Sequence, residues 1–308
     1  MHGIICVYKP QGYTSFDIIA IMRRLLNTKK IGHSGTLDPM AEGVLPTFVG
    51  TATKAVDFCQ IHDKEYRAAF KLGITTDTED ITGSILTEIS PTSFCVGKKT
   101  LQSIAMRYMG EIEQIPPMYS AVKVGGKKLY ELARKGVKPE NIERKSRRVT
   151  IHSLEIESYC SETNLGIMRV SCSKGTYIRT LIHDIGRELG LGATMTALQR
   201  TSSNGFSLEC CHTLKTLRDE FEVGGSSALS KFLLPLENFF DYPKAMLDVH
   251  QTEMFKNGVV LNADYIRMEK IYDGVYAVYD AIGRIIALAR IEKQSRSFSI
   301  LQRFNYGN

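Results

Sequence analysis

The most constraining feature of the sequence is a change of pattern around residue 245. Beyond it, short stretches alternate between apolar and polar residues, as in YDGVYAVYDAIGRIIALARIE and SFSILQRF, with turn dipeptides between them. This pattern is typical of short β-strands joined by tight turns. Before it, EVGGSSALS at 222–230 predicts a flexible surface stretch, and Pro243 interrupts the chain shortly before the alternation begins. We therefore expect a large domain at 1–243 and a small β-domain at 244–308.

The larger part mixes the patterns of helices and strands. The apolar run GIICVY predicts a buried strand at 3–8, and Thr14 or Ser15 can cap a helix that runs to Leu26. A polar loop is expected at 75–83. Further helices are expected near 100–109, 128–134 and 177–189, and further strands near 64–73, 147–158 and 166–172.

Positive charge is concentrated in one segment of the chain. Residues 121–148 hold ten Lys or Arg and three Asp or Glu, a net charge of +7, whereas the formal charge of the whole chain is +6. The other 280 residues therefore sum to −1. A surplus held in one place indicates contact with a polyanion, although a solvated basic loop would have the same composition.

Several classes of protein are excluded by what the sequence lacks. It has no apolar run of the roughly 20 residues that span a bilayer, and no signal-peptide pattern, so we expect a cytoplasmic protein without membrane contact. Its seven cysteines show no C-x-x-C pair, and neither zinc spacing nor H-E-x-x-H occurs. The phosphate-binding glycine motifs and G-x-S-x-G are also missing. We expect no metal and no cofactor.

A glycine-punctuated loop carries the first candidate for chemistry. In Gly35-Thr36-Leu37-Asp38-Pro39 the aspartate precedes a proline, which disfavours helical geometry at Asp38. Glycines at 32, 35 and 43 allow tight turns around it. Such a loop can present a carboxylate at the floor of a cleft, although a plain Asp-Pro turn would look the same.

Three further side chains are candidates for a binding site, and each has an ordinary structural alternative. Arg179, at the start of a helix, could pair with a carboxylate or lie in solvent. Tyr66, at the start of a strand, could stack on a base or lie in the core. His33 could contact a base or be a satisfied loop histidine.

Together these stretches resemble the bacterial tRNA pseudouridine synthase B (TruB) family. The matching stretches follow the family's order, and GTLDPxAxGVLP is the most specific of them. They include KPQGYTSFD (9–17), GHSGTLDPMAEGVLP (32–46), KEYRAAFKLG (64–73), TDTED (76–80), IEQIPPMYSAVKVGGKKLYELARKG (112–136) and CSKGTYIRTLIHDIG (172–186).

The resemblance implies the fold class and the substrate. The fold would be α/β, more strictly α+β, with a mixed, largely antiparallel central sheet of the pseudouridine synthase type and flanking helices. An active-site cleft would cross the middle of the sheet. Residues 112–148 would form an RNA-gripping insertion and 244–308 a PUA-like domain. The substrate would be the uridine at position 55 in the T-loop of tRNA.

The resemblance also assigns roles in the active site. Asp38 matches the catalytic aspartate and Arg179 the arginine that pairs with it. Tyr66 matches the tyrosine that stacks on the flipped uracil, and Tyr177 would shape the pocket. Leu198 matches an apolar pocket wall, but its stretch TALQR departs from the arginine pair associated with the family.

A second group of residues is expected to bind RNA. His33 matches the histidine that contacts the T-loop as the target base leaves its stack. Lys9 is placed in this group too, although the Lys9-Pro10 element is expected to give structural support. The remaining members are basic side chains: Lys123, Lys127, Lys128, Arg134, Lys135 and Lys174.

The expected reaction is an isomerisation that follows base flipping. The N1–C1′ bond of the uridine breaks and C5 joins C1′, without redox chemistry or net hydrolysis. Asp38 could attack C1′, attack C6 or remove the C2′ proton, and the sequence does not choose among these routes. We expect a monomer that acts on the tRNA T-arm without an obligate protein partner. The alternatives are a non-catalytic tRNA-folding chaperone and a guide-RNA-dependent pseudouridine synthase.

Overall fold

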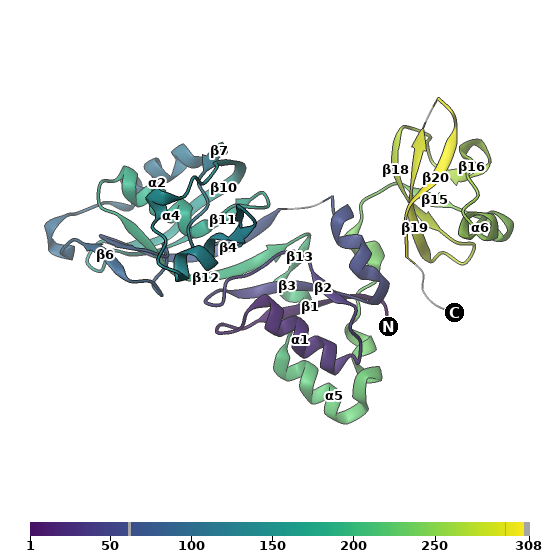
Figure 1. Ribbon diagram of the computed structural model, residues 1–308, viewed down its shortest axis with the longest axis horizontal. Helices are drawn as coiled ribbons and strands as arrows, with labels where there is room; N and C mark the ends of the chain where they lie inside the picture. The colour runs from purple at the N-terminus through teal and green to yellow at the C-terminus, as the bar shows by residue number, and fades with distance from the viewer. Residues whose placement is uncertain (61–62, 293, 305–308) are drawn as a thin grey trace.

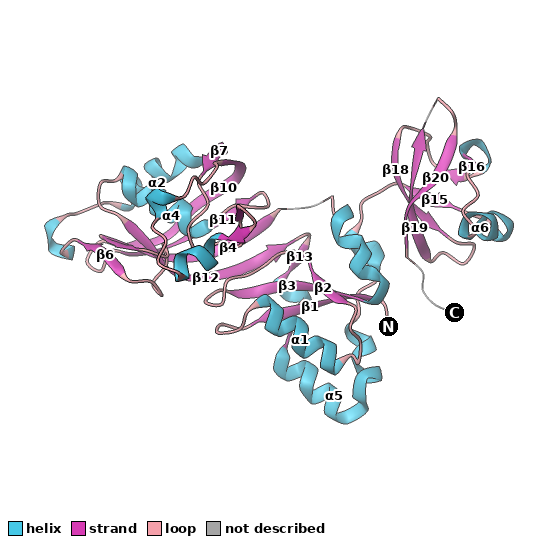
Figure 2. Ribbon diagram, viewed as in Figure 1, coloured by secondary structure: helices cyan, strands magenta, loops and turns pink. Residues whose placement is uncertain are grey.

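The structure, a computed structural model, describes residues 1–60, 63–292 and 294–304, and its described strands form one large sheet and several smaller ones (Figures 1 and 2). The large sheet has the order β14-β1-β3-β12-β4-β11-β10-β7, with β2 on β3 and β13 on β12. Its strands are β1 (Gly3–Lys9), β2 (Ile31–His33), β3 (Glu42–Val49), β4 (Lys64–Leu72), β7 (Gly110–Gln114), β10 (Arg147–Cys160), β11 (Leu165–Cys172), β12 (Ala193–Ser203), β13 (Phe206–Ser207) and β14 (His212–Thr213).

The large sheet is mixed and mostly antiparallel, as expected. Only β1 with β14 and β3 with β12 pair in parallel among its described strands. Helices pack on it in two groups (Figure 2), α1 (Ser15–Leu25) with α5 (Leu214–Ala228), and α2 (Lys98–Ala105) with α4 (Ile178–Glu188). The fold class predicted from the resemblance is confirmed.

The large sheet consists of two half-sheets, β14-β1-β3 and β12-β4-β11-β10-β7, which two register pairs join. Strands β3 and β12 pair only through Glu42 with Gln199 and Gly43 with Arg200. Gly43 has φ of +109°, and a Cβ there would lie 2.2 Å from the carbonyl oxygen of Arg200. A side chain at position 43 would therefore force the halves apart.

Local signals explain helix α1. Thr14 caps it in a reciprocal capping box with Asp17, as the position of Thr14 before the apolar pattern predicts. Ile18, Met22 and Leu25 lie on its buried face and pack against β1, β3 and α5. The predicted strand at 3–8 and the predicted helix to Leu26 are thus confirmed within one or two residues.

The predicted flexible surface stretch at 222–230 lies mostly at the surface, but it is mostly helical, so the prediction of an irregular segment is wrong. Residues up to 228 continue α5, with a kink where Gly224 and Gly225 leave helical geometry. Ser226 Oγ donates a hydrogen bond to the carbonyl of Leu25, and Leu229 is completely buried. The glycine-serine composition marks the kink, and tertiary packing against α1 orders the rest.

A second sheet contains only strands that follow residue 243. Its order is β16-β20-β19-β18-β15-β17. The strands are β15 (Lys244–Met246), β16 (Leu261–Asn262), β17 (Arg267–Met268), β18 (Gly274–Tyr279), β19 (Ile285–Glu292) and β20 (Ser297–Arg303). Helix α6 (Val249–Lys256), which the sequence analysis missed, packs Phe255 into its core behind a capping box of Asp248 and Gln251. This C-terminal domain is consistent with a PUA-like fold.

Shorter elements project from the large sheet. Strands β5 (Ile74–Thr76) and β6 (Ile85–Glu88) form a hairpin, so the predicted polar loop begins only after Thr76. Residues 115–146 leave the sheet between β7 and β10, within slightly narrower limits than the predicted insertion. They carry β8 (Lys123–Val124), β9 (Lys127–Lys128) and α3 (Leu129–Arg134). In the described part of the chain, none of the helices combines the length and apolar character needed to traverse a bilayer.

Candidate active site

The loop between β2 and β3 presents Asp38 at the junction of the two half-sheets. Leu37 is buried, and its N–H donates to Ser15 Oγ at 2.8 Å. The N–H of Ala41 donates to the carbonyl of Asp38, which closes the turn after it. Anchors on both sides of Asp38 hold its backbone, while 37% of its side chain stays exposed. The loop can therefore present a carboxylate to a ligand.

Lys9 is buried beneath this loop and does not reach the surface. Its ammonium donates to the carbonyls of Ala41 at 2.5 Å, Pro10 at 3.0 Å and Pro39 at 3.4 Å. Burial lowers the pKa of Lys9 to about 8, although the Asp38 carboxylate acts in the opposite direction. The structure contradicts the placement of Lys9 among RNA contacts, because its side chain is buried and donates to carbonyls inside the protein.

Asp38 pairs with Arg179, which enters from the first turn of α4. The two side chains come from different half-sheets, and Nη2 of the arginine lies 3.0 Å from Oδ2 of the aspartate. Only 5% of the Arg179 side chain is exposed. The solvated-arginine alternative is therefore wrong, and the guanidinium orients Asp38 across the junction.

A second carboxylate, missed by the sequence analysis, holds the same arginine. Oδ2 of Asp80 lies 3.3 Å from Nη1 of Arg179, and the side chain of Asp80 is 6% exposed. The other oxygen of Asp80 accepts hydrogen bonds from the hydroxyls of Thr78 and Thr82 and from the N–H of Thr82. Arg179 also donates to the carbonyls of Thr78 and Tyr119, both at 3.0 Å. These contacts leave the guanidinium a single orientation.

Tyr66 lies close to Asp38 and Arg200. It is 7% exposed and shares a hydrophobic cluster with Leu37 and Leu198. Burial raises the pKa of Tyr66 to about 12, while the neighbouring Arg200 acts in the opposite direction. A ring at the edge of the core next to Asp38 can serve both as core and as a platform for a base.

Arg200 is a second site residue that the sequence analysis did not identify. It is completely buried beneath the Asp38 loop. Its Nε donates to the carbonyl of Val44 at 2.8 Å, and its Nη atoms donate to those of Gly35 at 3.2 Å and Thr36 at 3.4 Å. Burial lowers the pKa of this guanidinium. Arg200 lies in the stretch TALQR, which departs from the arginine pair associated with the family. The sequence analysis therefore assigned no role to Arg200.

The remaining predicted residues lie around this centre. Tyr177 precedes α4, and its backbone exchanges two hydrogen bonds with the buried amide of Gln114. His33 is half-buried and accepts the N–H of Gly35 at Nδ1, while burial, more than nearby cations, lowers its pKa. Lys174 is exposed beyond the end of β11. The pocket role of Tyr177 and the RNA contacts of His33 and Lys174 stay predictions.

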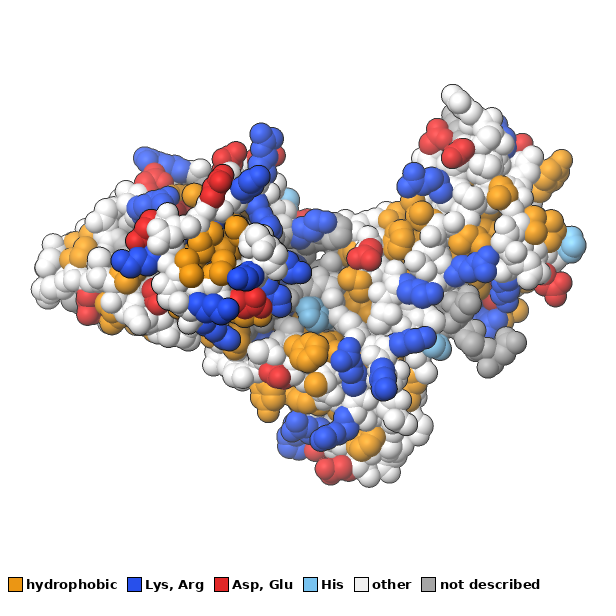
Figure 3. All heavy atoms as spheres, viewed as in Figure 1, with side chains coloured by type: hydrophobic (Ala, Val, Ile, Leu, Met, Phe, Trp, Pro, Cys, Tyr) orange, Lys and Arg blue, Asp and Glu red, His pale blue; other side chains and the backbone are white. Residues whose placement is uncertain are grey.

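The predicted basic segment is mostly on the surface. Lys123, Lys127, Arg134 and Lys135 are exposed, whereas Lys128 is half-buried and donates to the hydroxyl of Tyr130 at 3.2 Å. Figure 3 shows Lys and Arg side chains gathered on both sides of the junction between the half-sheets. This surface can bind a polyanion.

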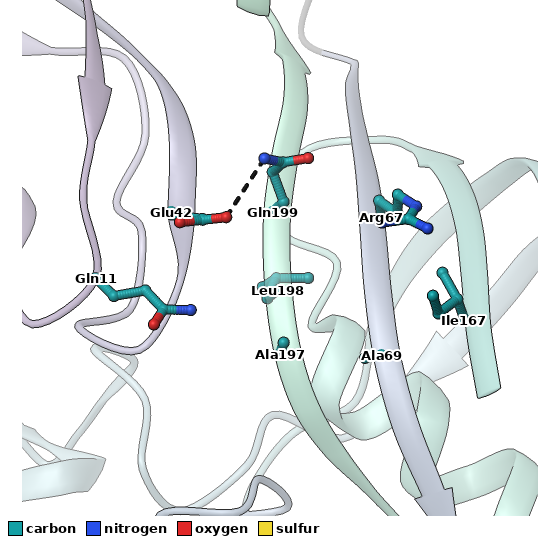
Figure 4. A pocket seen from close by; sticks show the side chains of 8 residues that line it. All are labelled: Gln11, Glu42, Arg67, Ala69, Ile167, Ala197, Leu198 and Gln199. Atoms are coloured by element: carbon teal, nitrogen blue, oxygen red, sulfur yellow. Dashed lines mark hydrogen bonds between the residues drawn. The ribbon is translucent and has the colours of Figure 1, made fainter. Parts of the chain in front are cut away.

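A separate pocket opens at the junction on the other side of the sheet (Figure 4). Arg67, Ala69 and Gln199 line it, together with Gln11 and Glu42 from the opposite half-sheet. Alternation along β4 places Arg67 and Ala69 on the face opposite Tyr66. Leu198 lines this pocket as well, but Asp38 and Arg179 do not. Within residues 1–60, 63–292 and 294–304 no cluster of three or more His, Cys, Asp or Glu could hold a metal.

Nearly the whole chain superimposes on solved pseudouridine synthases. One is a chain of "Crystal Structure of a Cbf5-Nop10-Gar1 Complex", with a TM-score of 0.73 and 28% identity, covering 98% of this chain and 85% of that one. Another is a chain of "Structure of H/ACA RNP bound to a substrate RNA containing 2'-deoxyuridine", with the same TM-score and 26% identity over 98% and 85%. The fold and the aspartate–arginine site define a pseudouridine synthase, which is an isomerase.

The particular family follows from sequence. The model "TruB family pseudouridylate synthase (N terminal domain)" matches residues 23–178, and "tRNA pseudouridylate synthase B C-terminal domain" matches 179–241. Proteins named "tRNA pseudouridine synthase B" from Clostridium tetani and Bacillus licheniformis are 43% and 42% identical, over 84% and 93% of this chain and 85% and 92% of their own. The chain belongs to the TruB family and is a tRNA-modifying enzyme.

Proposed function

We propose that this enzyme converts uridine 55 in the T-loop of tRNA to pseudouridine with Asp38 as its catalytic residue. The observation that carries the proposal is the partly exposed carboxylate of Asp38, 3.0 Å from the buried guanidinium of Arg179. That guanidinium also donates to the carbonyls of Thr78 and Tyr119 and pairs with Asp80. The family's activity on tRNA and the match of 9–17, 32–46 and 172–186 to its motifs support the choice of substrate.

The chemistry needs an extruded base. A loop uridine is stacked, and extrusion costs a few kcal/mol, which stacking on Tyr66 can offset by about 1–3 kcal/mol. The N1–C1′ bond then breaks, the uracil turns, C5 bonds to C1′, and the proton from C5 is released. Asp38 is placed to attack C1′ or C6 or to take the C2′ proton, and Arg179 orients it for each route. The base is neither oxidised nor hydrolysed.

We also propose that the enzyme works alone. Its relatives named tRNA pseudouridine synthase B are 38–43% identical, against 28% and 26% for the chains from the Cbf5 and H/ACA complexes. The higher identity favours direct recognition of the T-arm over a guide RNA. The site residues argue against a purely non-catalytic tRNA chaperone. A monomer, a cytoplasmic location and a domain boundary at 243/244 belong to the same proposal.

The deciding experiment uses the purified chain, unmodified tRNA transcript and no other RNA or protein. Pseudouridine is mapped by nucleotide in the full transcript and in an isolated T-arm stem-loop, with a transcript carrying cytidine at position 55 as the control. Formation at position 55 in both substrates, and nowhere in the control, is expected. Dependence on an added guide RNA or on the anticodon arm would contradict the proposal.

Replacement of Tyr66 should separate its ring from its hydroxyl. Tyr66→Phe keeps the ring, so RNA binding should stay within a few-fold of wild type. Tyr66→Leu removes the stacking surface, so capture of the flipped base should weaken by about 1–3 kcal/mol, roughly fivefold to 150-fold. Single-turnover rates measured over a range of enzyme concentrations report both effects.

Phe70→Leu is the matched control for Tyr66→Leu. Phe70 lies four residues further along the same strand, on the same face, and is buried in the same hydrophobic cluster as Tyr66. The control should lose stability and keep its reaction rate. Full activity in both Tyr66 variants would show that Tyr66 is an ordinary core residue.

The basic segment should contribute to RNA affinity through phosphates. Lys123, Lys127 and Lys135 are exposed, so replacing all three with alanine should leave the fold unchanged. Removal of one phosphate contact should reduce the slope of log affinity against log salt by roughly 0.7–0.9. Saturating single-turnover rates should change much less. Filter binding of tRNA at several salt concentrations measures the slope.

A triple variant of exposed lysines elsewhere controls for net charge. Lys29, Lys215 and Lys256 lie after α1, in α5 and in α6, away from the basic segment. Their replacement with alanine should change the slope less than the first variant does. Equal slopes in both triple variants would mean that the basic segment only contributes to the general field of the protein.

A further inference from the structure

Basic side chains gather near Gly35, in the loop that carries Asp38. We call Lys64, Arg200, His33 and Lys174 the Gly35 cluster. A Cβ added at Gly35 would lie 2.9 Å from Nζ of Lys64 and 3.6 Å from Nη1 of Arg200. Lys64 therefore rests on one side of the loop backbone, while Arg200 donates to two of its carbonyls.

Lys64 has no acidic partner among the residues that the structure describes. Within that part of the chain no hydrogen bond or ion pair engages its ammonium, and the cations Arg200 and Lys174 act on it, with Cys172 acting in the opposite direction. The neighbouring acids are engaged elsewhere: Asp63 pairs with His152 at 3.1 Å, and Glu65 accepts from Thr201 at 2.8 Å. Half-buried, unpaired positive charge attracts an anion, which would compensate it.

The position of Lys64 relative to Tyr66 indicates which anion. Both lie on β4, two residues apart, so their side chains share one face of the sheet. The rise of two strand residues is roughly 7 Å, within the length of one nucleotide. Lys64 pairs in register with Cys172 of β11, and exposed Lys174 lies two residues further along the chain. A nucleotide whose base lies on Tyr66 would bring its backbone to this cluster.

We propose that Lys64 binds a backbone phosphate of the RNA loop beside the extruded uridine, with Arg200 and Lys174 adding to the attractive field. The inference rests on the proposed function and names a contact within it. Arg200 does not touch the phosphate, because it is completely buried. Lys64 is the contact, since its ammonium is half-buried and unpaired in the described part of the chain.

The protonation of Lys64 gives the site a pH dependence. Burial, more than the charge of Arg200 and Lys174, lowers the pKa of Lys64 to about 8. A bound phosphate would raise that pKa, because it favours the ammonium. Binding is therefore full below about pH 8 and weakens as the pH rises above it. The other groups that face Lys64 are His33, whose pKa is lowered, and Cys172, whose thiol pKa is raised to about 11.

Lys64→Met tests the contact, because methionine keeps an unbranched stem without charge. Lys71→Met, at the other end of the same strand, is the matched control. With a T-arm stem-loop, Lys64→Met should weaken binding about tenfold, reduce the salt slope by about 0.7, and abolish the loss of affinity above pH 8. The control should keep wild-type values for all three.

Single methylphosphonates placed along the stem-loop identify the phosphate. One such neutral linkage next to position 55 should weaken binding to the wild type and leave binding to Lys64→Met unchanged, because the partner is already absent. Additive losses at every linkage, or a Lys64→Met variant with wild-type affinity, would overturn the inference. If Lys64→Met did not fold, the wild-type protein alone would still decide. Binding of every methylphosphonate stem-loop as tightly as the unmodified stem-loop would overturn the inference. Pseudouridine formation by wild type on the same stem-loop separately tests the proposed function.

Discussion

Asp38→Asn is expected to bind tRNA within a few-fold of wild type and to form no detectable pseudouridine. Asparagine has the same size, and its side-chain oxygen can still accept a hydrogen bond from Arg179, so the loop should keep its conformation. It has neither the nucleophilicity nor the basicity of a carboxylate. The expected loss of rate is about 10⁴-fold or more, which corresponds to roughly 5 kcal/mol of barrier.

Single-turnover assays with enzyme in excess measure this loss without interference from product release. Asp57→Asn, at an exposed aspartate after β3, is the matched control and should react like wild type. Binding is measured in parallel by filter retention. A turnover within tenfold of wild type in Asp38→Asn, less than about 1.4 kcal/mol of barrier, would remove Asp38 from the chemistry.

The parts of the site that the sequence predicted are those carried by continuous motifs. Asp38 lies in a loop whose glycines and Asp-Pro pair restrict the backbone, and Arg179 begins a helix after a strand. Their pairing across the two half-sheets depended on the resemblance to the TruB family. Sequence spacing alone did not bring together residues 141 positions apart, and the 3.0 Å contact is a product of the tertiary fold.

The parts that were missed depend on burial. Asp80 lies in a stretch of Thr and Asp that is typical of a surface loop, yet only 6% of its side chain is exposed. Arg200 is completely buried, and so is Lys9, which the sequence analysis named but placed among the RNA contacts, although charged residues usually lie at the surface. Arg200 and Lys9 donate to carbonyls of the Asp38 loop, and no periodic pattern in the sequence marks such contacts. Their role follows from contacts that only the folded chain reveals.

The order of the chain after residue 213 was predicted unevenly for similar reasons. Strands β18, β19 and β20 follow from alternation and turn dipeptides, because register on a half-buried sheet requires that alternation. Helix α6 was missed because it is only two turns long and its capping box was not identified. The kink at Gly224 and Gly225 lowers the helical signal of α5, while packing against α1 stabilises the helix on both sides.

Arg179→Met is expected to reduce both stability and rate, because the guanidinium pairs with two carboxylates. Without it, Asp80 remains buried with no cation, and such broken pairs cost about 3–5 kcal/mol of folding free energy. Asp38 loses the group that orients it, and we expect single-turnover rates to fall about 10³-fold, roughly 4 kcal/mol. Urea unfolding and pseudouridine formation are measured on the same preparation.

The double variant Arg179→Met/Asp80→Asn separates the two effects. It removes the unpaired buried charge, so it should recover part of the lost stability relative to Arg179→Met. Its rate should stay low, because Asp38 still lacks its partner. Arg187→Met, which removes an exposed arginine that pairs with Asp184 on the same helix, should destabilise the protein less than Arg179→Met does and leave the rate unchanged. If the stable double variant reacted within tenfold of wild type, Arg179 would be a structural residue only, and Asp38 would act without the orientation that this guanidinium imposes.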